Sequence, residues 1–444
     1  MAQVAEESMH EKSTAADEIA NGFAHKPSAG SYYVLAMLTV IYSLNFLDRT
    51  VINILIDPIK HEYHLSDTSM GLITGFGFVM MYSILAAPVA RWADRSNRRS
   101  IITGGLVIWS GMTALAGVAR SAIQLTLSRF GVGIGEAAGT APSASMISDL
   151  FPNEKRSSAM SIYQLGPVFG GFLGAFIGGW VNQYYGWHQA FLVAGIPGLL
   201  VALIFRLTVK EPVRGNSEAK KVNTAQAGVG ETLRYMASQK SYMLLLAGFC
   251  FTTYTQFGFG AWTAPYLGRI RHLNSAQIGT YLGTIKAVAG LIGTLAGGYL
   301  ADWAGRRDAR WRVYVPGICS MIAGPAVLVF LFAPNSWVSM GGFAVISAMG
   351  PVYVGPLVGV SHSVVKVGMR AFSTSVLYLI AEIVGLGLGP YFIGAFNDQY
   401  AHRLGVGVIR YSMATAAATT FLGGVIFIIA AQYLKRDMAR TLAE

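Results

Sequence analysis

Long apolar runs alternate with short polar stretches along most of this chain. A helix rises about 1.5 Å per residue, so about 20 apolar residues cross the hydrocarbon core of a bilayer. The pattern predicts twelve membrane-spanning helices, at residues 31–56, 69–90, 100–119, 122–148, 158–182, 187–208, 239–267, 276–301, 312–333, 337–364, 371–396 and 408–433. An even number of spans places both termini on the same side of the membrane.

The widest polar gap falls between the sixth and seventh predicted spans. It divides the chain into a disordered cytoplasmic tail (1–30), an N-terminal six-helix lobe (31–208), a cytoplasmic linker (209–238), a C-terminal six-helix lobe (239–435) and a second cytoplasmic tail (436–444). The predicted fold is therefore an all-α membrane protein with two pseudo-symmetric lobes, an arrangement typical of secondary transporters.

A short motif occurs before span three and again before span nine, about half a chain later. ARWADRSNRR covers residues 90–99 and GYLADWAGRR covers residues 298–307, and both fit small-x-x-x-Asp-x-x-x-basic-basic. The same motif at the same place in each half indicates an internal duplication. Two unrelated basic loops are the alternative.

The composition agrees with a membrane protein. Of 444 residues, 53% are hydrophobic and only 12% are charged, whereas soluble domains carry about 25% charged residues. The net charge of +11 comes from Lys and Arg concentrated in alternate loops, a pattern that places the basic side in the cytoplasm, so no nucleic-acid partner is expected. The lack of any Asn-X-Ser/Thr sequence favours a bacterial inner membrane.

Two charged residues lie inside the fourth predicted span. Arg129 and Glu136 are about two helical turns apart, so both side chains project from one helical face, about 10 Å apart along the axis. A charge that faces lipid costs several kcal/mol, so such residues turn inward and by default mark a substrate, ion or proton path. A structural ion pair that joins two helices is the alternative.

The first span carries a second polar group, formed by Asn45, Asp48 and Arg49. Asp48 lies about 25 Å along the helix from residue 31, at a depth similar to that of Arg129, so these two residues are a candidate pair. Glu136 lies nearer the midplane, within reach of Arg49. The alternative is that Asp48 and Arg49 form a charge pair at the helix end.

The repeated loops resemble the signature loop of the major facilitator superfamily, with Ala90 in place of the usual first Gly. The elements at 129–133 and 166–171 resemble that superfamily's Arg-x-x-x-Gly and Gly-Pro elements. More narrowly, NFLDRTVINILIDPIK, LSRFGVGIGEAAGTAPSASMISDLFP and YGWHQAF are similar to segments of the spinster family of lysolipid transporters. The resemblance implies that spans one and four line a central cavity.

The resemblance also implies a gate at the two motif loops. In the superfamily, the motif Asp interacts with the N-terminus of a helix in the other lobe and with the loop's own Arg, and so holds the cytoplasmic side shut. The gating residues expected on this basis are Asp94, Arg95, Arg98, Asp302 and Arg306.

The C-terminal half offers Lys286 in span eight and Glu382 in span eleven, both near mid-span. We favour a structural pair between them over a contact with substrate, because nothing in the sequence places them in the cavity. Tyr254 and Phe257 in span seven are candidates for an apolar groove, although packing is the commoner role of such aromatic residues.

These residues favour a secondary transporter with a site for an anion. The resemblance to the spinster family implies that the substrate is an amphiphilic anion, such as a lysophospholipid or a sphingoid phosphate, moved by alternating access. The expected substrate-binding residues are Arg49, Arg129, Asn45 and Glu136, and the expected proton-coupling residues are Glu136 and Asp48. An anion that neutralises the Arg lets the carboxylate take a proton more easily, which is the logic of antiport. The alternative is a drug/proton antiporter or a carrier of a small organic anion.

No enzyme activity, metal site or cofactor is expected. A nucleophile elbow, zinc-ligand spacing and a phosphate loop are all missing from the sequence. Transport would therefore use a gradient of protons or of sodium, or run down the gradient of the substrate itself. The expected partners are the lipid bilayer and a lysolipid or other amphiphilic small molecule, and we expect a monomer.

Overall fold

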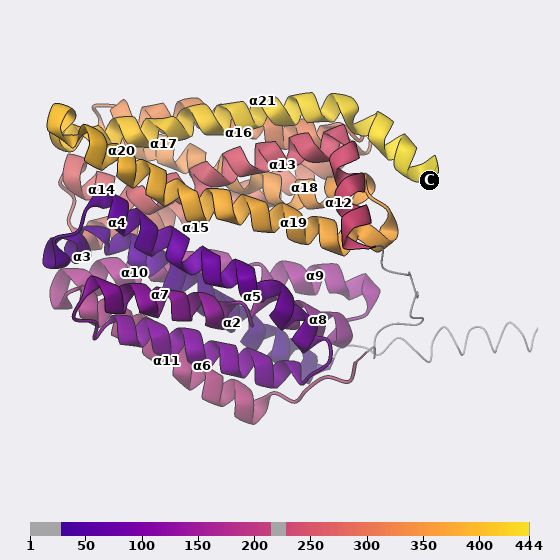
Figure 1. Ribbon diagram of the computed structural model, residues 1–444, viewed down its shortest axis with the longest axis horizontal. Helices are drawn as coiled ribbons and strands as arrows, with labels where there is room; N and C mark the ends of the chain where they lie inside the picture. The colour runs from indigo at the N-terminus through magenta and orange to yellow at the C-terminus, as the bar shows by residue number, and fades with distance from the viewer. Residues whose placement is uncertain (1–27, 215–227, 444) are drawn as a thin grey trace, which may run out of the picture.

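The computed structural model describes residues 28–214 and 228–443, which are almost entirely helical (Figure 1). The N-terminal lobe comprises α2 (Ala29–Ile54), α3 (Ile56–Tyr63), α4 (Asp67–Gly71), η1 (Leu72–Phe76), α5 (Gly77–Ala93), α6 (Arg98–Ala116), α7 (Ala122–Glu136), α8 (Thr140–Leu150), α9 (Asn153–Tyr163), α10 (Gly166–Tyr185) and α11 (Trp187–Thr208). The C-terminal lobe comprises α12 (Val229–Ser238), α13 (Lys240–Thr253), η2 (Tyr254–Phe259), α14 (Gly260–Arg271), α15 (Ser275–Gly305), α16 (Trp311–Phe332), α17 (Ser336–Met349), η3 (Gly350–Tyr353), α18 (Val354–Ser363), η4 (Val367–Met369), α19 (Arg370–Glu382), η5 (Ile383–Leu388), α20 (Gly389–Leu404), η6 (Gly405–Gly407) and α21 (Val408–Ala443).

The predicted spans are all present, in two lobes that lie against each other (Figure 1). Each span is one helix or a run of consecutive helices, such as α4, η1 and α5 for the second span. Within the described ranges, eight helical stretches are long and apolar enough to cross a membrane, and one of these, Val367–Ala443, contains spans eleven and twelve. The all-α, two-lobed fold predicted from the hydrophobic pattern is therefore confirmed.

The fourth span is not the single helix that the sequence predicted. α7 ends at Glu136 and α8 begins at Thr140, with a turn at residues 137–139. Pro142 in the first turn of α8 has no N–H to donate, and in a continuous helix its ring would clash with the carbonyl of Ala138. The break places Glu136 at the end of a helix instead of in its middle.

In the part of the chain that the structure describes, three spans contain a π-helical turn, and these turns lie where the lobes meet. η1 of the N-terminal lobe contacts η5 of the C-terminal lobe, and η5 contacts η2. A Cβ on Gly75 in η1 would lie 2.2 Å from the carbonyl oxygen of Leu386 in η5, so this approach requires a glycine. π-Helical turns occur frequently at functional sites.

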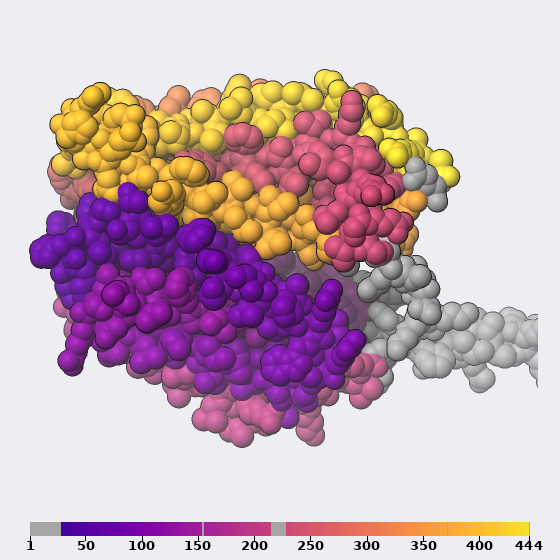
Figure 2. All heavy atoms as spheres, in the orientation of Figure 1, coloured from indigo at the N-terminus to yellow at the C-terminus, as the bar shows by residue number. Residues whose placement is uncertain are grey.

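The lobes meet at one end and separate toward the other. We call the end with loops 93–98, 150–153, 208–214 and 305–311 the basic end, and the opposite end the far end. Hydrogen bonds and ion pairs between the lobes concentrate toward the far end, from α3, α4 and α10 to α14, α15 and α20. Figure 2 shows the lobes touching toward the left and a recess between them toward the right.

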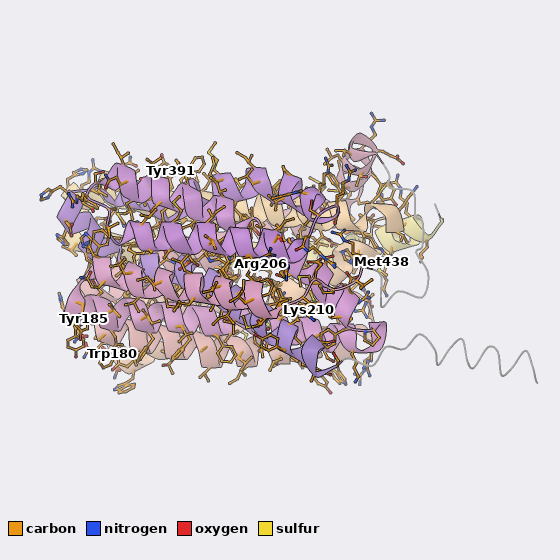
Figure 3. The ribbon with its side chains drawn as sticks, turned by 90° about the horizontal axis from the view of Figure 1, so that it is seen from below. Trp180, Tyr185, Arg206, Lys210, Tyr391 and Met438 are labelled. Carbon is orange, nitrogen blue, oxygen red and sulfur yellow. The ribbon has the colours of Figure 1, made fainter. Side chains whose placement is uncertain are left out.

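Figure 3 relates this view to the chain: Trp180, Tyr185 and Tyr391 lie toward the far end, and Lys210 and Met438 lie toward the basic end. Two helices extend into the segments predicted as linker and tail, since α12 falls within 209–238 and α21 continues to Ala443. Asp437 in that extension accepts hydrogen bonds from the Ser241 N–H and hydroxyl, both at 2.8 Å. The predicted tail at 1–30 lies almost wholly outside the described residues.

Candidate functional site

An ion pair between the first and fourth spans forms the centre of the candidate site. Arg49 Nε on α2 donates to Glu136 Oε2 on α7 at 2.7 Å, the contact that their depths in the sequence predicted. The Glu136 side chain is fully buried and that of Arg49 is 11% exposed. The guanidinium carbon also lies 5.3, 4.6 and 5.2 Å from the ring centroids of Phe46, Phe78 and Tyr82. Cation–π attraction and the ion pair therefore both hold the Arg49 guanidinium in place.

Asp48 and Arg129 form a second, deeper group, each about 1% exposed. Arg129 and Thr113 are polar neighbours of Asp48, and Asn45 is a polar neighbour of Glu136. The predicted Asp48–Arg129 pair is electrostatic only, because no direct ion pair joins the two residues in this part of the described chain. Asp48 Oδ1, Arg129 Nε and Nη1, and Glu136 Oε1 have no hydrogen-bond partner among the described residues. Each such buried atom costs about 1–3 kcal/mol, so they mark a place where a water, a proton or a ligand would be stabilised.

Glycines bring α7 close to its neighbours and so enclose these charges. A Cβ on Gly135 would lie 2.6 Å from the backbone nitrogen of Trp109 in α6, and one on Gly133 would lie 2.5 Å from the carbonyl oxygen of Phe78 in α5. Small residues permit this close approach between membrane helices. The side chains of Arg129 and Glu136 are consequently surrounded by α2, α5 and α6 instead of lipid.

The C-terminal lobe contributes Glu382 to the same site. It is the last residue of α19, directly before the π-helical turn η5 that contacts the other lobe. Its carboxylate is close enough to Arg49, Tyr82 and Glu136 to act on them electrostatically. The site therefore draws charged residues from both lobes.

Lys286 does not form the structural pair with Glu382 that the sequence analysis favoured. No acidic side chain in the described ranges acts on Lys286, and Glu382 faces Arg49 instead. Lys286 is exposed near the middle of α15, and its Nζ lies 3.7 Å from where a Cβ on Gly260 would be. The Lys286–Glu382 pair was expected because both residues lie near the middle of their spans. Depth in the membrane does not determine the direction in which each helix face is turned.

The aromatic residues of span seven serve mainly as packing. The Tyr254 hydroxyl is 3.1 Å from Thr415 Oγ1 of α21, within the same lobe. Phe259 and Trp262 are 2% and 0% exposed. Phe257 is half-buried. Packing, the role that the sequence analysis favoured for Tyr254 and Phe257, accounts for Tyr254 and also for the neighbouring Phe259 and Trp262.

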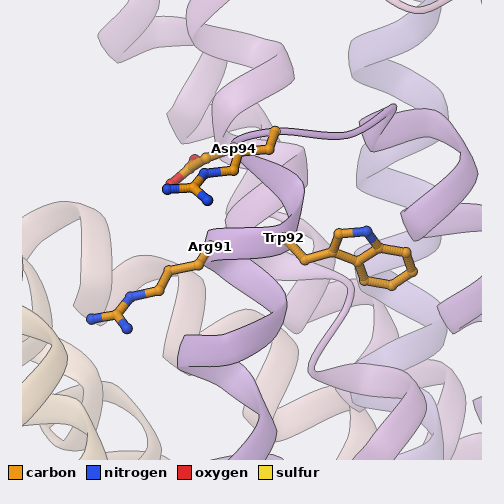
Figure 4. A pocket seen from close by; sticks show the side chains of 4 residues that line it. Arg91, Trp92 and Asp94 are labelled. Atoms are coloured by element: carbon orange, nitrogen blue, oxygen red, sulfur yellow. The ribbon is translucent and has the colours of Figure 1, made fainter.

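The predicted gate residues of the first motif loop lie at the open, basic end. Asp94 and Arg95 are exposed and line a surface pocket with Arg91 and Trp92. Figure 4 shows Arg91 and Trp92 pointing in different directions from the end of α5. Within the described chain, the Asp94 carboxylate forms no ion pair, neither with its own loop nor with the other lobe. The contact expected from the resemblance is therefore absent in this open state.

Arg98 differs from its neighbours in the motif because it is buried inside the N-terminal lobe. Its guanidinium donates to Glu211 at 2.8 Å and also pairs with Asp149. These contacts join the beginning of α6 to the ends of α8 and α11. Arg98 thus connects three helices of one lobe, and the hydrogen bonds that its side chain makes to described residues all stay within that lobe.

In the second motif loop, Asp302 and Arg306 are exposed. The ion pairs of that loop use Asp308 instead, which accepts from Arg310 and from Lys435 of α21, both at 2.8 Å. Hydrogen bonds from Arg310 and Lys435 hold the pKa of Asp308 well below its ordinary value. These contacts attach the loop to the last helix of its own lobe.

The sequence analysis missed a group of polar residues that joins the lobes at the far end. Arg269 of α14 donates to Asp57 of α3 and to Asp67 of α4, both at 2.6 Å. Asp67 also pairs with Lys60 and accepts from Asn397 of α20 at 2.9 Å. These residues lie at the edges of predicted spans and belong to no motif. Their position at a span edge was therefore the only feature of the sequence that could have indicated a contact between the lobes.

Asp398 completes this group by capping a helix of the other lobe. Its carboxylate accepts from the backbone N–H groups of Asp67 and Thr68 at 3.0 and 2.7 Å. A carboxylate at this position satisfies free N–H groups and is favoured by the helix dipole. We call Asp57, Lys60, Asp67, Arg269, Asn397 and Asp398 the far-end cluster. It forms the kind of interlobe helix cap that the resemblance to the superfamily implied for Asp94 at the other end.

Comparison with known proteins agrees with this architecture. Residues 38–318 match the model of the Major Facilitator Superfamily. The chain is 27% identical over 409 residues to an MFS-type efflux pump of Mycolicibacterium smegmatis, across 92% of this chain and 94% of that protein. It is 26% identical over 430 residues to the sphingosine-1-phosphate transporter SPNS2 of Danio rerio, across 89% of this chain and 82% of that protein.

The structure is also similar to a solved bacterial homologue of the human lysosomal transporter spinster, in an inward-facing and unoccupied conformation. The TM-score is 0.83 at 30% identity, over 93% of this chain and 99% of that chain. The relatives in this family are transporters and not enzymes. From its family match, its two-lobed helical fold and its buried interlobe charges, the chain is a multi-pass membrane transporter that belongs to the Major Facilitator Superfamily and is related, within it, to the bacterial spinster homologues.

Proposed function

We propose that the protein carries a single-chain amphiphilic anion, such as a lysophospholipid or a sphingoid phosphate, across a bacterial inner membrane by proton-coupled alternating access. The observation that carries the proposal is the buried Arg49–Glu136 ion pair, which faces Glu382 of the other lobe. The printed name of the SPNS2 relative supports the substrate class. The basic end, with both termini, would face the cytoplasm.

The ion pair offers a direct exchange of an anion for a proton. A guanidinium presents planar donors that suit a phosphate or carboxylate group. An anion that binds Arg49 weakens its attraction for Glu136, and the carboxylate, now without its cation, takes a proton. Departure of the anion restores the pair and releases the proton. Asp48, which lies near Arg129 in the second group, would then accept the proton from Glu136.

Alternating access requires that each end close in turn. The far-end cluster holds the far end closed in the present state. Asp94, Arg95, Arg98, Asp302 and Arg306 would form the corresponding closure at the basic end. Asn45 and Arg129 would complete the substrate contacts between these two gates.

A drug/proton antiporter is the second candidate. Its support is the similarity to an efflux pump and the position of Glu382, a carboxylate without a direct ion pair in the described chain that a cationic drug would complement.

Flux measurements on liposomes containing the purified protein separate these functions. With an imposed pH gradient, we expect accelerated flux of a lysophospholipid or a sphingoid phosphate and none of a cationic dye. Flux of the dye alone would establish the drug antiporter instead, and equal lipid flux with and without the gradient would refute proton coupling.

A further inference from the structure

The C-terminal lobe holds an accessible cation that the exchange at Arg49 does not use. Lys286 lies near the middle of the 31-residue helix α15, and so near the midplane of the membrane. A charged side chain at this depth is costly if it faces lipid, and it is expected to face the protein interior or a water-filled space.

The part of α15 that precedes Lys286 packs against the N-terminal lobe with the face that carries Lys286. On the same face, a Cβ on Gly279 would lie 2.3 Å from the carbonyl oxygen of Ala175, and one on Gly283 would lie 3.2 Å from that of Phe172, both in α10. Lys286 follows Gly279 by about two helical turns, toward the basic end. Its exposure shows that α10 no longer covers the helix there, so the side chain faces the space between the lobes.

Lys286 also lacks the carboxylate neighbours that the buried arginines have. Arg49 is paired with Glu136, and Arg129 lies near Asp48 and Glu136. In the described ranges no acidic side chain acts on Lys286. An anion that enters from the basic end would have to displace a carboxylate at Arg49, whereas at Lys286 it meets an uncompensated charge.

We propose that Lys286 is an anion-binding residue of the C-terminal lobe, and that a phosphate-bearing headgroup binds it first while the protein is open toward the basic end. The substrate class rests on the proposed function above. Gly260 keeps the space beside Nζ free, since any side chain at that position would begin 3.7 Å from the ammonium group. A charge-assisted contact of this kind raises affinity by about tenfold or more.

Binding of two lipids to the purified full-length protein tests the proposal. The probes are 1-oleoyl lysophosphatidate and 1-monooleoylglycerol, which share the acyl chain and differ in the phosphate. Lys286→Gln should weaken lysophosphatidate binding about tenfold and leave monooleoylglycerol binding unchanged, whereas Lys286→Arg should retain most of the affinity. Lys240→Gln, which removes an exposed charge at the start of α13, is the matched control and should bind both lipids as the parent does.

A thiol placed beside Lys286 provides a second readout that leaves the lysine intact. In a background with Cys250→Ala and Cys319→Ala, Gly260→Cys should react with a soluble thiol reagent, and lysophosphatidate should slow that reaction where monooleoylglycerol does not. If Lys286→Gln no longer binds either lipid, the protection of Gly260→Cys by lysophosphatidate decides whether the headgroup binds beside Lys286.

Unchanged lysophosphatidate affinity in Lys286→Gln, or an unprotected Gly260→Cys, overturns the proposal for Lys286 and leaves the proposed function standing. A parent protein that binds neither lipid overturns the proposed function itself.

Discussion

Asp48 and Arg49 are neighbours in sequence but face different surroundings, because consecutive residues of a helix point about 100° apart. Arg49 reaches Glu136 and lies near Glu382 of the other lobe. Asp48 is turned toward Thr113 and Arg129, inside the N-terminal lobe. Two consecutive residues of α2 therefore belong to two different groups, one at the lobe boundary and one buried within the N-terminal lobe.

Glu136→Gln should abolish the dependence of lipid flux on the pH gradient, because an amide keeps the shape of the carboxylate but takes no proton. Flux of lysophosphatidate into liposomes at gradients of either sign provides the measurement. Glu231→Gln, on an exposed carboxylate of α12, is the control and should respond to the gradient as the parent does. A normal gradient response in Glu136→Gln would exclude this residue as the proton carrier.

At the scale of helices, the close approach of α6 and α7 keeps the charged face of α7 away from lipid. Two adjacent glycines of α6 differ in their part in this contact. A Cβ on Gly105 would lie 2.6 Å from Ala138 Cβ and 2.7 Å from the Gly135 carbonyl oxygen, whereas one on Gly104 would have nothing within 4 Å. The contact thus depends on one glycine of the pair.

Gly105→Ala should lower the free energy of unfolding by about 1–3 kcal/mol, because the added methyl group pushes α6 from α7. Gly104→Ala should leave it unchanged or raise it by up to about 1 kcal/mol, since alanine favours the helix. Thermal unfolding of the two variants in one detergent compares them directly. The opposite order of stabilities would contradict the α6–α7 contact.

At the scale of the molecule, polar contacts join the lobes at the far end, and the motif loops lie apart at the basic end. The single side chain of Arg269 contacts two acids of the other lobe, Asp57 and Asp67. Arg271, two residues later, donates only to the carbonyl groups of Ala333 and Pro334 in its own lobe. The two arginines therefore allow the interlobe contact to be tested on one helix.

Arg269→Gln should increase the population of molecules open at the far end, because it leaves two acids of the N-terminal lobe without their shared cation. The pair is partly exposed and Asp67 keeps Lys60, so the cost is below the about 3–5 kcal/mol of a fully buried ion pair. A cost of about 1.4 kcal/mol already changes the ratio of two states tenfold. Spin labels at Tyr185 and Arg403, one in each lobe, should show longer distances. Arg271→Gln should keep the parental distances, and equal distributions in all three proteins would exclude the far-end cluster as a gate.

Asp94→Asn should have the opposite preference and favour the state open toward the basic end. The lost charge would have stabilised a helix N-terminus of the other lobe by about 1 kcal/mol, which corresponds to about a fivefold change in the ratio of states. Reaction of Trp303→Cys with a soluble thiol reagent should become faster. Asp308→Asn removes an acid whose ion pairs stay within one lobe and is the control. Equal reaction rates in Asp94→Asn and the parent would contradict the gate.

The sequence by itself determined the spans and the two lobes, and its motifs indicated the family, because span length and short motifs are local properties of the chain. It also identified Arg49, Glu136 and their contact, since an unshielded charge in lipid is too costly to face outward. Helix rotation and lobe contact are not local, and only the tertiary structure decided them. They separate Lys286 from Glu382, place Glu382 beside Arg49, and assemble the far-end cluster from four span edges whose charges would otherwise suggest only solvent exposure.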